Sequence, residues 1–183
     1  AHPETDMPLQ AEEVGEIQVR PKMSGGFMAG YYRMPEETVK AWKNLWFHTG
    51  DAGKYDQDGY FYFIDRIKDC IRRRGENISS FEVEKVIFDY PGIEECAVIA
   101  VPSEIPGGED EIMAVIECAT ELDPKLVITH CQQGMPAFAV PRYLRLLGSE
   151  QIPRTTTNKV RKVALRNTGI TNDTYDMQSA DSK

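Results

Sequence analysis

Two runs of almost uninterrupted apolar residues constrain the fold of this chain more than any other feature. ECAVIAV covers residues 95–101, and EIMAVIECA covers residues 111–119. Runs of this length and composition are typical of strands in the middle of a sheet, so both are predicted to be central strands. The loop between them contains Pro106, Gly107 and Gly108, which are typical turn residues.

Helix signals lie on both sides of this pair of strands. Ser79-Ser80-Phe81-Glu82 matches a capping box before a helix that Pro91-Gly92 ends. Asp123-Pro124 predicts the start of a second helix that stops at Gly134, and RYLRLL at 142–147 predicts another short strand. The order helix, strand, strand, helix, strand predicts a compact α+β unit with helices packed on a small sheet.

The flanking segments have a different character. Residues 1–64 are predicted to be β-rich with one short helix: GEIQVR at 15–20 alternates polar and apolar residues, and Asp58-Gly59 is typical of a hairpin turn. Pro35 and the acidic residues after it favour the helix. From about Asn167 the chain is polar and short of large apolar residues, which predicts a frayed tail.

Composition excludes several classes of protein. With 41% hydrophobic residues the chain can form a core, and no apolar run is long enough to span a bilayer. The first residues lack the features of a secretory signal, and the missing initiator methionine suggests a piece of a longer protein. The four cysteines match no zinc spacing and the three histidines suggest no metal site, so we expect a reducing, cytoplasmic compartment and no resident metal.

A local basic run contrasts with the formal net charge of −8. Arg72, Arg73 and Arg74 lead directly into Gly75. Side chains alternate between the faces of a strand, so at most two of the three arginines can face one ligand and the third is expected to be structural or solvated. The alternative is a solubilising or nucleic-acid-binding run, against which the acidic charge of the whole chain argues.

Four segments together resemble the AMP-forming acyl-CoA synthetases, part of the adenylate-forming superfamily. The segments are MAGYYRMPEET (28–38), WFHTGD (46–51), DGYFYFIDRIKDCIRRRGENISSFEVE (58–84) and IPRTTTNKVRK (152–162). They occur in the family's order, and the similarity spans about residues 15–166. The run CIRRRGENISSFEVEKVIFDYP most resembles the carnitine and crotonobetaine CoA ligase branch.

The resemblance implies that the chain is the C-terminal part of such a synthetase. Residues 1–65 would be the β-rich end of the large domain, residues 66–166 the small mobile domain, and residues 167–183 a polar tail. The family's Ser/Thr/Gly-rich phosphate loop with its following lysine is not in this sequence; MSGGFMAG at 23–30 lacks that lysine. We therefore expect the chain to be inactive without the rest of the synthetase chain.

The reaction that the resemblance implies has two steps. A carboxylate attacks the α-phosphorus of ATP to give an acyl-adenylate and pyrophosphate, and the thiol of CoA then attacks the activated carbonyl and releases AMP. The implied partners are therefore the acid, ATP and CoA, with Mg²⁺ arriving with ATP and bound mainly outside this chain. No nucleic acid and no membrane span are expected.

Three residues are assigned to the nucleotide and to the hinge by the resemblance. Asp51 would bind the ribose hydroxyls, although an Asp after Thr-Gly is also a common turn residue. Arg66 would contact the nucleotide with its guanidinium fork, or else form an interdomain salt bridge. Lys68 matches the hinge position, where an ordinary exposed lysine is the alternative.

Lys159 is the predicted catalytic residue. Its counterpart in the family orients the substrate carboxylate and the α-phosphate during adenylation; the alternative is a surface lysine. The family usually has glycine before this lysine, and here Asn158 stands in its place. Asparagine tolerates the left-handed backbone better than most residues, so the turn is expected to form.

The CoA site is assigned to Gly75 and its neighbours. The family's glycine lines the pantetheine tunnel, and glycine allows a backbone to approach a ligand closely. Arg72 and Arg74 would then meet the phosphates of CoA, with Glu76 and Asn77 shaping the tunnel. Two further functions remain open: another adenylate-forming enzyme, such as a peptide-synthetase adenylation domain or a luciferase, and a non-catalytic nucleotide- or RNA-binding module.

Overall fold

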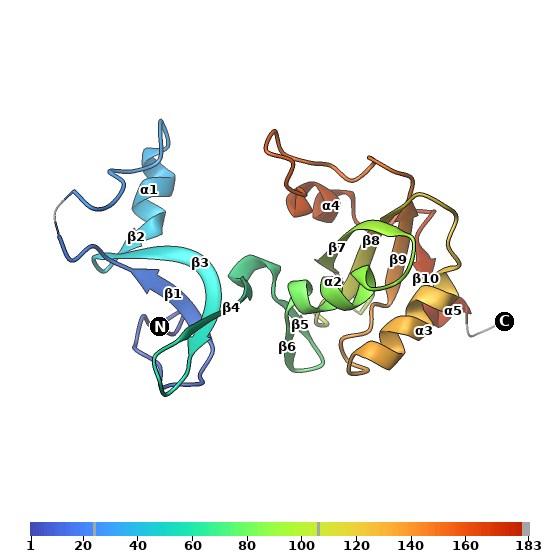
Figure 1. The fold of residues 1–183 in the computed structure, drawn as a ribbon, viewed down its shortest axis with the longest axis horizontal. Helices are drawn as coiled ribbons and strands as arrows, with labels where there is room; N and C mark the ends of the chain where they lie inside the picture. Colours follow the sequence, from blue (N-terminus) through green and yellow to red (C-terminus); the bar gives the residue numbers. More distant parts are fainter. Residues whose placement is uncertain (24, 106, 181–183) are drawn as a thin grey trace. The chain divides into compact units, whose positions relative to one another are not determined.

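The computed structural model describes residues 1–23, 25–105 and 107–180; Ser24, Pro106 and the last three residues of the predicted tail lie outside it. The chain forms two compact units, residues 1–68 and residues 69–183. Figure 1 shows the helices and strands of each unit. Within the described part of the chain, no helix has both the length and the apolar character needed to cross a bilayer.

The first unit is a small antiparallel sheet with one helix, as the sequence predicts. Strand β3 is its centre and pairs with β1, β2 and β4. The turn at Gly59, where φ is +88°, leads from β3 into β4, so the predicted hairpin is confirmed. The elements are β1 (Gly15–Val19), α1 (Pro35–Ala41), β2 (Trp42–Lys43), β3 (Trp46–Tyr55) and β4 (Phe61–Arg66).

The second unit has the predicted order of helix, strand, strand, helix, strand around a four-stranded sheet. The sheet order is β10-β9-β8-β7, with β8 and β9 parallel and the other neighbours antiparallel. A 3-10 turn η1 (Ile67–Asp69) precedes it in the chain. The elements are β5 (Ile71–Arg73), β6 (Glu76–Ile78), α2 (Ser80–Phe88), β7 (Ile93–Val101), β8 (Glu111–Cys118), α3 (Pro124–Gly134), β9 (Tyr143–Leu147), α4 (Lys162–Thr168), β10 (Tyr175–Asp176) and α5 (Met177–Ala180).

The two faces of this sheet are covered by different parts of the chain. Alternate residues of β7 and β8 point to opposite faces, so the strands contribute to two hydrophobic clusters. One cluster includes Val83 and Ile87 of α2 and Val127 of α3. The other includes Leu165 of α4 and Ile152 from the segment after β9. Both apolar strands are therefore buried on both faces, and the α+β fold class is confirmed. The prediction that both are central strands is correct for β8, which lies between β9 and β7, and wrong for β7, which is the edge strand of the sheet. An apolar run reveals that both faces of a strand are covered, but not whether the strand has a neighbour on each edge.

Side-chain caps fix where the two longer helices begin. The Ser79 hydroxyl accepts the Glu82 backbone N–H, and the Asp123 carboxylate accepts the Lys125 backbone N–H. Each cap satisfies a backbone donor that the first turn of a helix leaves without a partner. The predicted starts of both helices are confirmed.

The segment after Asn167 differs from its prediction as a frayed tail. Residues Tyr175 and Asp176 pair with β9 as strand β10, and Tyr175 and Met177 pack on the core. The guanidinium of Arg142 donates to both carboxylate oxygens of Asp176, at 3.1 and 3.0 Å. The polar composition of the segment did not reveal this docking, because its partners lie about thirty residues earlier in the chain.

The arginine run also has a structural member, as the alternation of side chains predicts. Arg73 is buried, and its Nη1 donates to the carbonyl oxygens of Phe138 and Val140 at 3.0 and 2.8 Å. Its Nε lies 2.7 Å from Oε2 of Glu111. Burial lowers the pKa of the Arg73 guanidinium from its ordinary value, and the nearby Glu111 carboxylate opposes that change. Arg73 therefore joins the β5–β6 hairpin to the sheet.

We predict that Arg73→Ala lowers the free energy of unfolding by about 3 kcal/mol, because it leaves the carboxylate of Glu111 desolvated and without its cation. Arg72→Ala is the matched control. Its side chain is 66% exposed, so the change should be within about 0.5 kcal/mol. Urea unfolding followed by circular dichroism measures both values, and equal losses in the two variants would contradict the structural role of Arg73.

Candidate functional site

Asp51 and Arg66 come together across two neighbouring strands of the first unit. They are directly opposite in the β3–β4 register, and Nη1 of Arg66 lies 2.8 Å from Oδ1 of Asp51. The same nitrogen donates to the Thr49 carbonyl oxygen at 3.0 Å. The Arg66 side chain is 52% exposed, so the guanidinium is oriented by protein contacts while part of it can still meet a ligand.

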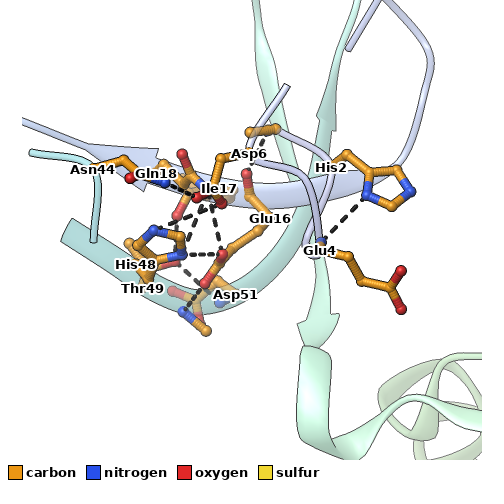
Figure 2. A network of polar contacts seen from close by, with 12 residues as sticks. His2, Glu4, Asp6, Glu16, Ile17, Gln18, Asn44, His48, Thr49 and Asp51 are labelled. Atoms are coloured by element: carbon orange, nitrogen blue, oxygen red, sulfur yellow. Dashed lines mark hydrogen bonds and ion pairs between the residues drawn. The ribbon is translucent and has the colours of Figure 1, made fainter. Parts of the chain in front are cut away.

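Hydrogen bonds fix the irregular part of strand β3 that carries Asp51, where the register with β1 shifts (Figure 2). His48 Nδ1 lies 2.6 Å from Oε2 of the buried Glu16, whose Oε1 accepts the Gly50 backbone N–H at 3.1 Å. Thr49 Oγ1 accepts the Asp51 backbone N–H at 3.0 Å. Gly50 has φ +71°, a conformation that glycine adopts without strain. His48 is therefore part of the hydrogen-bond network that holds the backbone around Asp51.

A cavity of about 450 Å³ lies beside this part of β3 in the first unit. Its lining includes the cationic residues Lys43, Arg66 and Lys68, together with His48 and Gly50 of β3. The carboxylate of Glu16 also reaches the lining, where His48 and Gly50 already occupy its oxygens. This surface suits an anionic group of a ligand.

Lys68, the predicted hinge residue, lies in the 3-10 turn η1, and the two compact units divide directly after it. The sequence placed the domain boundary after residue 65. The next residue, Asp69, is ion-paired with Arg166 of α4. The chain is thus anchored to the second unit immediately after Lys68, while the hinge role of Lys68 stays a prediction.

Gly75 lies in the two-residue turn of the β5–β6 hairpin. Arg73 pairs with Glu76, and the residues between them, Arg74 and Gly75, have φ values of +54° and +80°. Positive φ at both central positions is characteristic of a type I′ turn, which explains the glycine without a ligand. A Cβ on Gly75 would meet no atom within 4 Å, so the space beside it is open for a ligand.

A carboxylate that the sequence analysis missed lies at this turn. Oε2 of Glu109 accepts the Gly75 backbone N–H at 2.9 Å, and Oε1 lies 3.6 Å from Nε of Arg72. Arg72 and Arg74 are both exposed. Among the described residues, the Arg74 guanidinium has no hydrogen-bond or ion-pair partner. The turn therefore presents two cations to the solvent, while the carboxylate of Glu109 already accepts its backbone donor.

Lys159 lies near the tip of a second small hairpin. The hairpin begins at an isolated bridge between Arg154 and Val160, and the Lys159 backbone N–H donates to Thr155 Oγ1 at 3.1 Å. Asn158 has φ +64°, so the expected left-handed conformation before the lysine is confirmed. The Lys159 side chain is exposed, and its ammonium group has no partner among the residues that the structure describes.

The predicted site residues thus form three groups. Asp51, Arg66 and Lys68 belong to the first unit, whereas the Gly75 turn and the Lys159 hairpin belong to the second. Sequence reasoning missed Glu117. It is a charged residue inside a largely apolar strand, and this contrast is the feature of the sequence that could have revealed it. Sequence reasoning also missed Glu16 and Glu109, whose roles depend on contacts with residues 34 positions away in each case.

Two chemical features bear on the expected compartment and metal. All four cysteines are free thiols, and Cys96, Cys118 and Cys131 are buried. Burial raises the pKa of the Cys131 thiol to about 11. Over the described part of the chain, His, Cys, Asp and Glu side chains form no group of three or more that is placed to hold a metal ion.

Comparison with known proteins matches both units. Residues 82–159 match the model of the AMP-binding enzyme C-terminal domain. The chain is 38% identical over 161 residues to a peroxisomal trans-cinnamate:CoA ligase of Petunia hybrida, covering 87% of the chain and 27% of the relative. It is 33% identical over 164 residues to a crotonobetaine/carnitine–CoA ligase of Salmonella arizonae, covering 89% and 31%.

A solved structure gives the same result. The crystal structure of ATP-bound MatB from Rhodopseudomonas palustris superposes with a TM-score of 0.75 at 31% identity, covering 91% of this chain and 32% of MatB. The chain thus spans about a third or less of the length of the proteins it matches. Residues 82–159 belong to the AMP-binding enzyme C-terminal domain family, and over most of its length the chain is similar to CoA ligases in sequence and to MatB in fold.

Proposed function

We propose that this chain is the C-terminal part of an ATP-dependent acyl-CoA synthetase, which activates a carboxylic acid as its acyl-adenylate and transfers the acyl group to CoA. The observation that carries the proposal is the exposed ammonium group of Lys159 on an ordered hairpin. Family membership supports it, and so do the two relatives above, both of which are CoA ligases by name.

In the first step, Lys159 is proposed to orient the acid and the α-phosphate of ATP. Both groups are anions, and a positioned ammonium group offsets the negative charge that builds up when the carboxylate attacks phosphorus. Asp51 would accept hydrogen bonds from the ribose hydroxyls, and Arg66 would meet the nucleotide. Their ion pair holds both side chains on one side of the β3–β4 pair, which suits a shared ligand.

In the second step, the Gly75 turn is proposed to face CoA. The open space beside Gly75 would admit the pantetheine arm, and Arg72 and Arg74 would meet phosphate groups. Phosphate would then compete with Glu109 for Arg72 and for the Gly75 backbone N–H. A rotation at Lys68 would present the Lys159 hairpin in one step and the Gly75 turn in the other.

The nature of the acid is left open by this proposal. The relatives are named for cinnamate and for crotonobetaine or carnitine, which are chemically different acids. Mg²⁺ would arrive with ATP and bind mainly to groups outside this chain. The free cysteines agree with a reducing compartment, which we infer to be the cytoplasm.

The first test is ATP–pyrophosphate exchange by the purified 183-residue chain, with Mg²⁺ and a panel of carboxylic acids. We expect no exchange, because the sequence has no phosphate loop of the family's type. The complete synthetase, in which this chain is joined to the large domain, should catalyse exchange with at least one acid. Exchange by the chain alone would contradict the assignment of adenylation to a larger site.

Replacement of Lys159 tests the first step. In the complete synthetase, Lys159→Ala should slow adenylate formation by about 10²–10³-fold, the usual effect of losing one group that stabilises the transition state. Thioester formation from supplied acyl-adenylate should change little. Lys125→Ala, at another exposed lysine, is the control. Equal losses in both half-reactions would remove Lys159 from this role.

Replacement of Gly75 tests the second step. Gly75→Leu should slow thioester formation by about tenfold or more, equivalent to about 1.4 kcal/mol of barrier, and spare adenylation. Gly59→Leu controls for backbone strain, because Gly59 also has a positive φ and no atom within 4 Å of an added Cβ. An unchanged thioester rate in the Gly75 variant, or the same loss in both variants, would refute the assignment.

A further inference from the structure

Two carboxylates face each other across strands β7 and β8 of the second sheet, near the start of β7 and the end of β8. Glu95 of β7 and Glu117 of β8 are directly opposite in the antiparallel register. Like charges in this arrangement destabilise a sheet, and Glu117 is only 2% exposed. A buried carboxylate without a cation is costly, so the pair requires a positively charged partner.

Arg154 is that partner. Its Nη1 lies 3.0 Å from Oε2 of Glu95, and its Nη2 lies 3.1 Å from Oε2 of Glu117. The other oxygen of Glu117 accepts the backbone N–H of Ile152, two residues before Arg154. One guanidinium thus bridges both strands with two separate nitrogens, a geometry that the single ammonium group of lysine cannot reproduce.

Arg154 is also the first residue of the Lys159 hairpin. The bridge to Val160 closes the hairpin, and the Thr155 backbone N–H donates to the Lys159 carbonyl oxygen at 2.8 Å. Nη1 of Arg154 reaches the carbonyl oxygen of Asn158, the residue before the lysine, at 3.4 Å. The same guanidinium therefore contacts the sheet and the turn that presents Lys159.

Apolar packing fixes only the base of the hairpin. Ile152 is buried in the cluster that includes Leu165, and Val160 packs against that cluster. Residues 155–159 are exposed, so the core does not define their conformation. Their position depends on the hydrogen bonds within the hairpin and on the attachment of Arg154 to Glu95 and Glu117, which we call the Arg154 clamp.

We propose that the Arg154 clamp is a positioning device for the adenylation step, with Arg154 as the residue that sets where Lys159 enters the active site. The inference rests on the proposed role of Lys159. In this proposal Glu95 and Glu117 orient Arg154. Neither these two carboxylates nor Arg154 contacts the substrate.

The first experiment uses the 183-residue chain itself and needs no activity. Glu117→Gln keeps the side-chain size but removes the charge that holds Arg154. Hydrogen exchange should accelerate by about tenfold or more at the Thr155 and Lys159 amides, which do not contact Glu117, and stay unchanged in the strand β7 amides. Glu121→Gln, at an exposed carboxylate just after β8, is the control. Unchanged exchange at both hairpin amides would overturn the clamp.

The second experiment measures both half-reactions of the complete synthetase. Arg154→Ala should slow adenylation by about 10²-fold, the effect expected of a misplacement of about 1 Å, and leave thioester formation from supplied acyl-adenylate within about twofold. Arg154→Lys should give an intermediate rate, because lysine keeps the charge but cannot bridge both carboxylates. Equal losses in both half-reactions would indicate a merely structural residue and overturn the proposal.

A double substitution separates the failure of this inference from the failure of the proposed function. If Arg154 acts through Lys159, Arg154→Ala combined with Lys159→Ala should be no slower in adenylation than Lys159→Ala alone. Additive losses would overturn the positioning role and leave the role of Lys159 intact. Normal adenylation by the Lys159→Ala variant would instead overturn the proposed function. The positioning role of Arg154 would then be overturned as well, even if hydrogen exchange showed that the Arg154 clamp holds the hairpin.

Discussion

The arrangement of the second unit depends on strand β8, which is paired on both edges and buried on both faces. Helices α2 and α3 cover one face, and α4 with Ile152 and Val160 covers the other. Glu117 is a buried charged residue near the end of this largely apolar strand, and its carboxylate accepts the Ile152 backbone N–H at the base of the Lys159 hairpin. A rigid strand is a better support for a reactive loop than another loop, because its residues are held from every side.

Left-handed backbone at three positions shapes the two functional turns. Arg74 and Gly75 complete the turn of one hairpin, and Asn158 precedes the lysine in the other. Few side chains tolerate such conformations, which cost most residues about 1–2 kcal/mol. Hydrogen bonds within each turn offset part of this cost, so both functional loops have a defined shape before a ligand arrives.

Local signals predicted most of the fold. Caps, turn residues and apolar runs lie close together in sequence, so both helices and both apolar strands of the second unit followed from short windows, although the edge position of β7 did not. The docking of Asp176 onto Arg142 and the bridge from Arg154 to Glu117 join residues more than thirty positions apart. A single sequence shows the charges in such pairs but not which charge each will meet.

The candidate site shows the same division. The residue types and their motifs pointed to Lys159, Asp51 and Arg66 separately, and the strand register that places the last two opposite each other came only from the structure. The left-handed Asn158 was predictable from the properties of the side chain. Glu109 was not, because nothing in its loop sequence indicates that it reaches the Gly75 turn.

The distribution of charge explains how an acidic chain can present cationic sites. Asp51 pairs with Arg66, and Glu109 lies beside Arg72, so these cations already have anionic neighbours. A phosphate would therefore displace or share a carboxylate to bind there, which would lower its affinity. Arg74 and Lys159 have no such neighbour within the described residues. They are the positions at which a bound anion gains a new ionic contact without breaking an existing one.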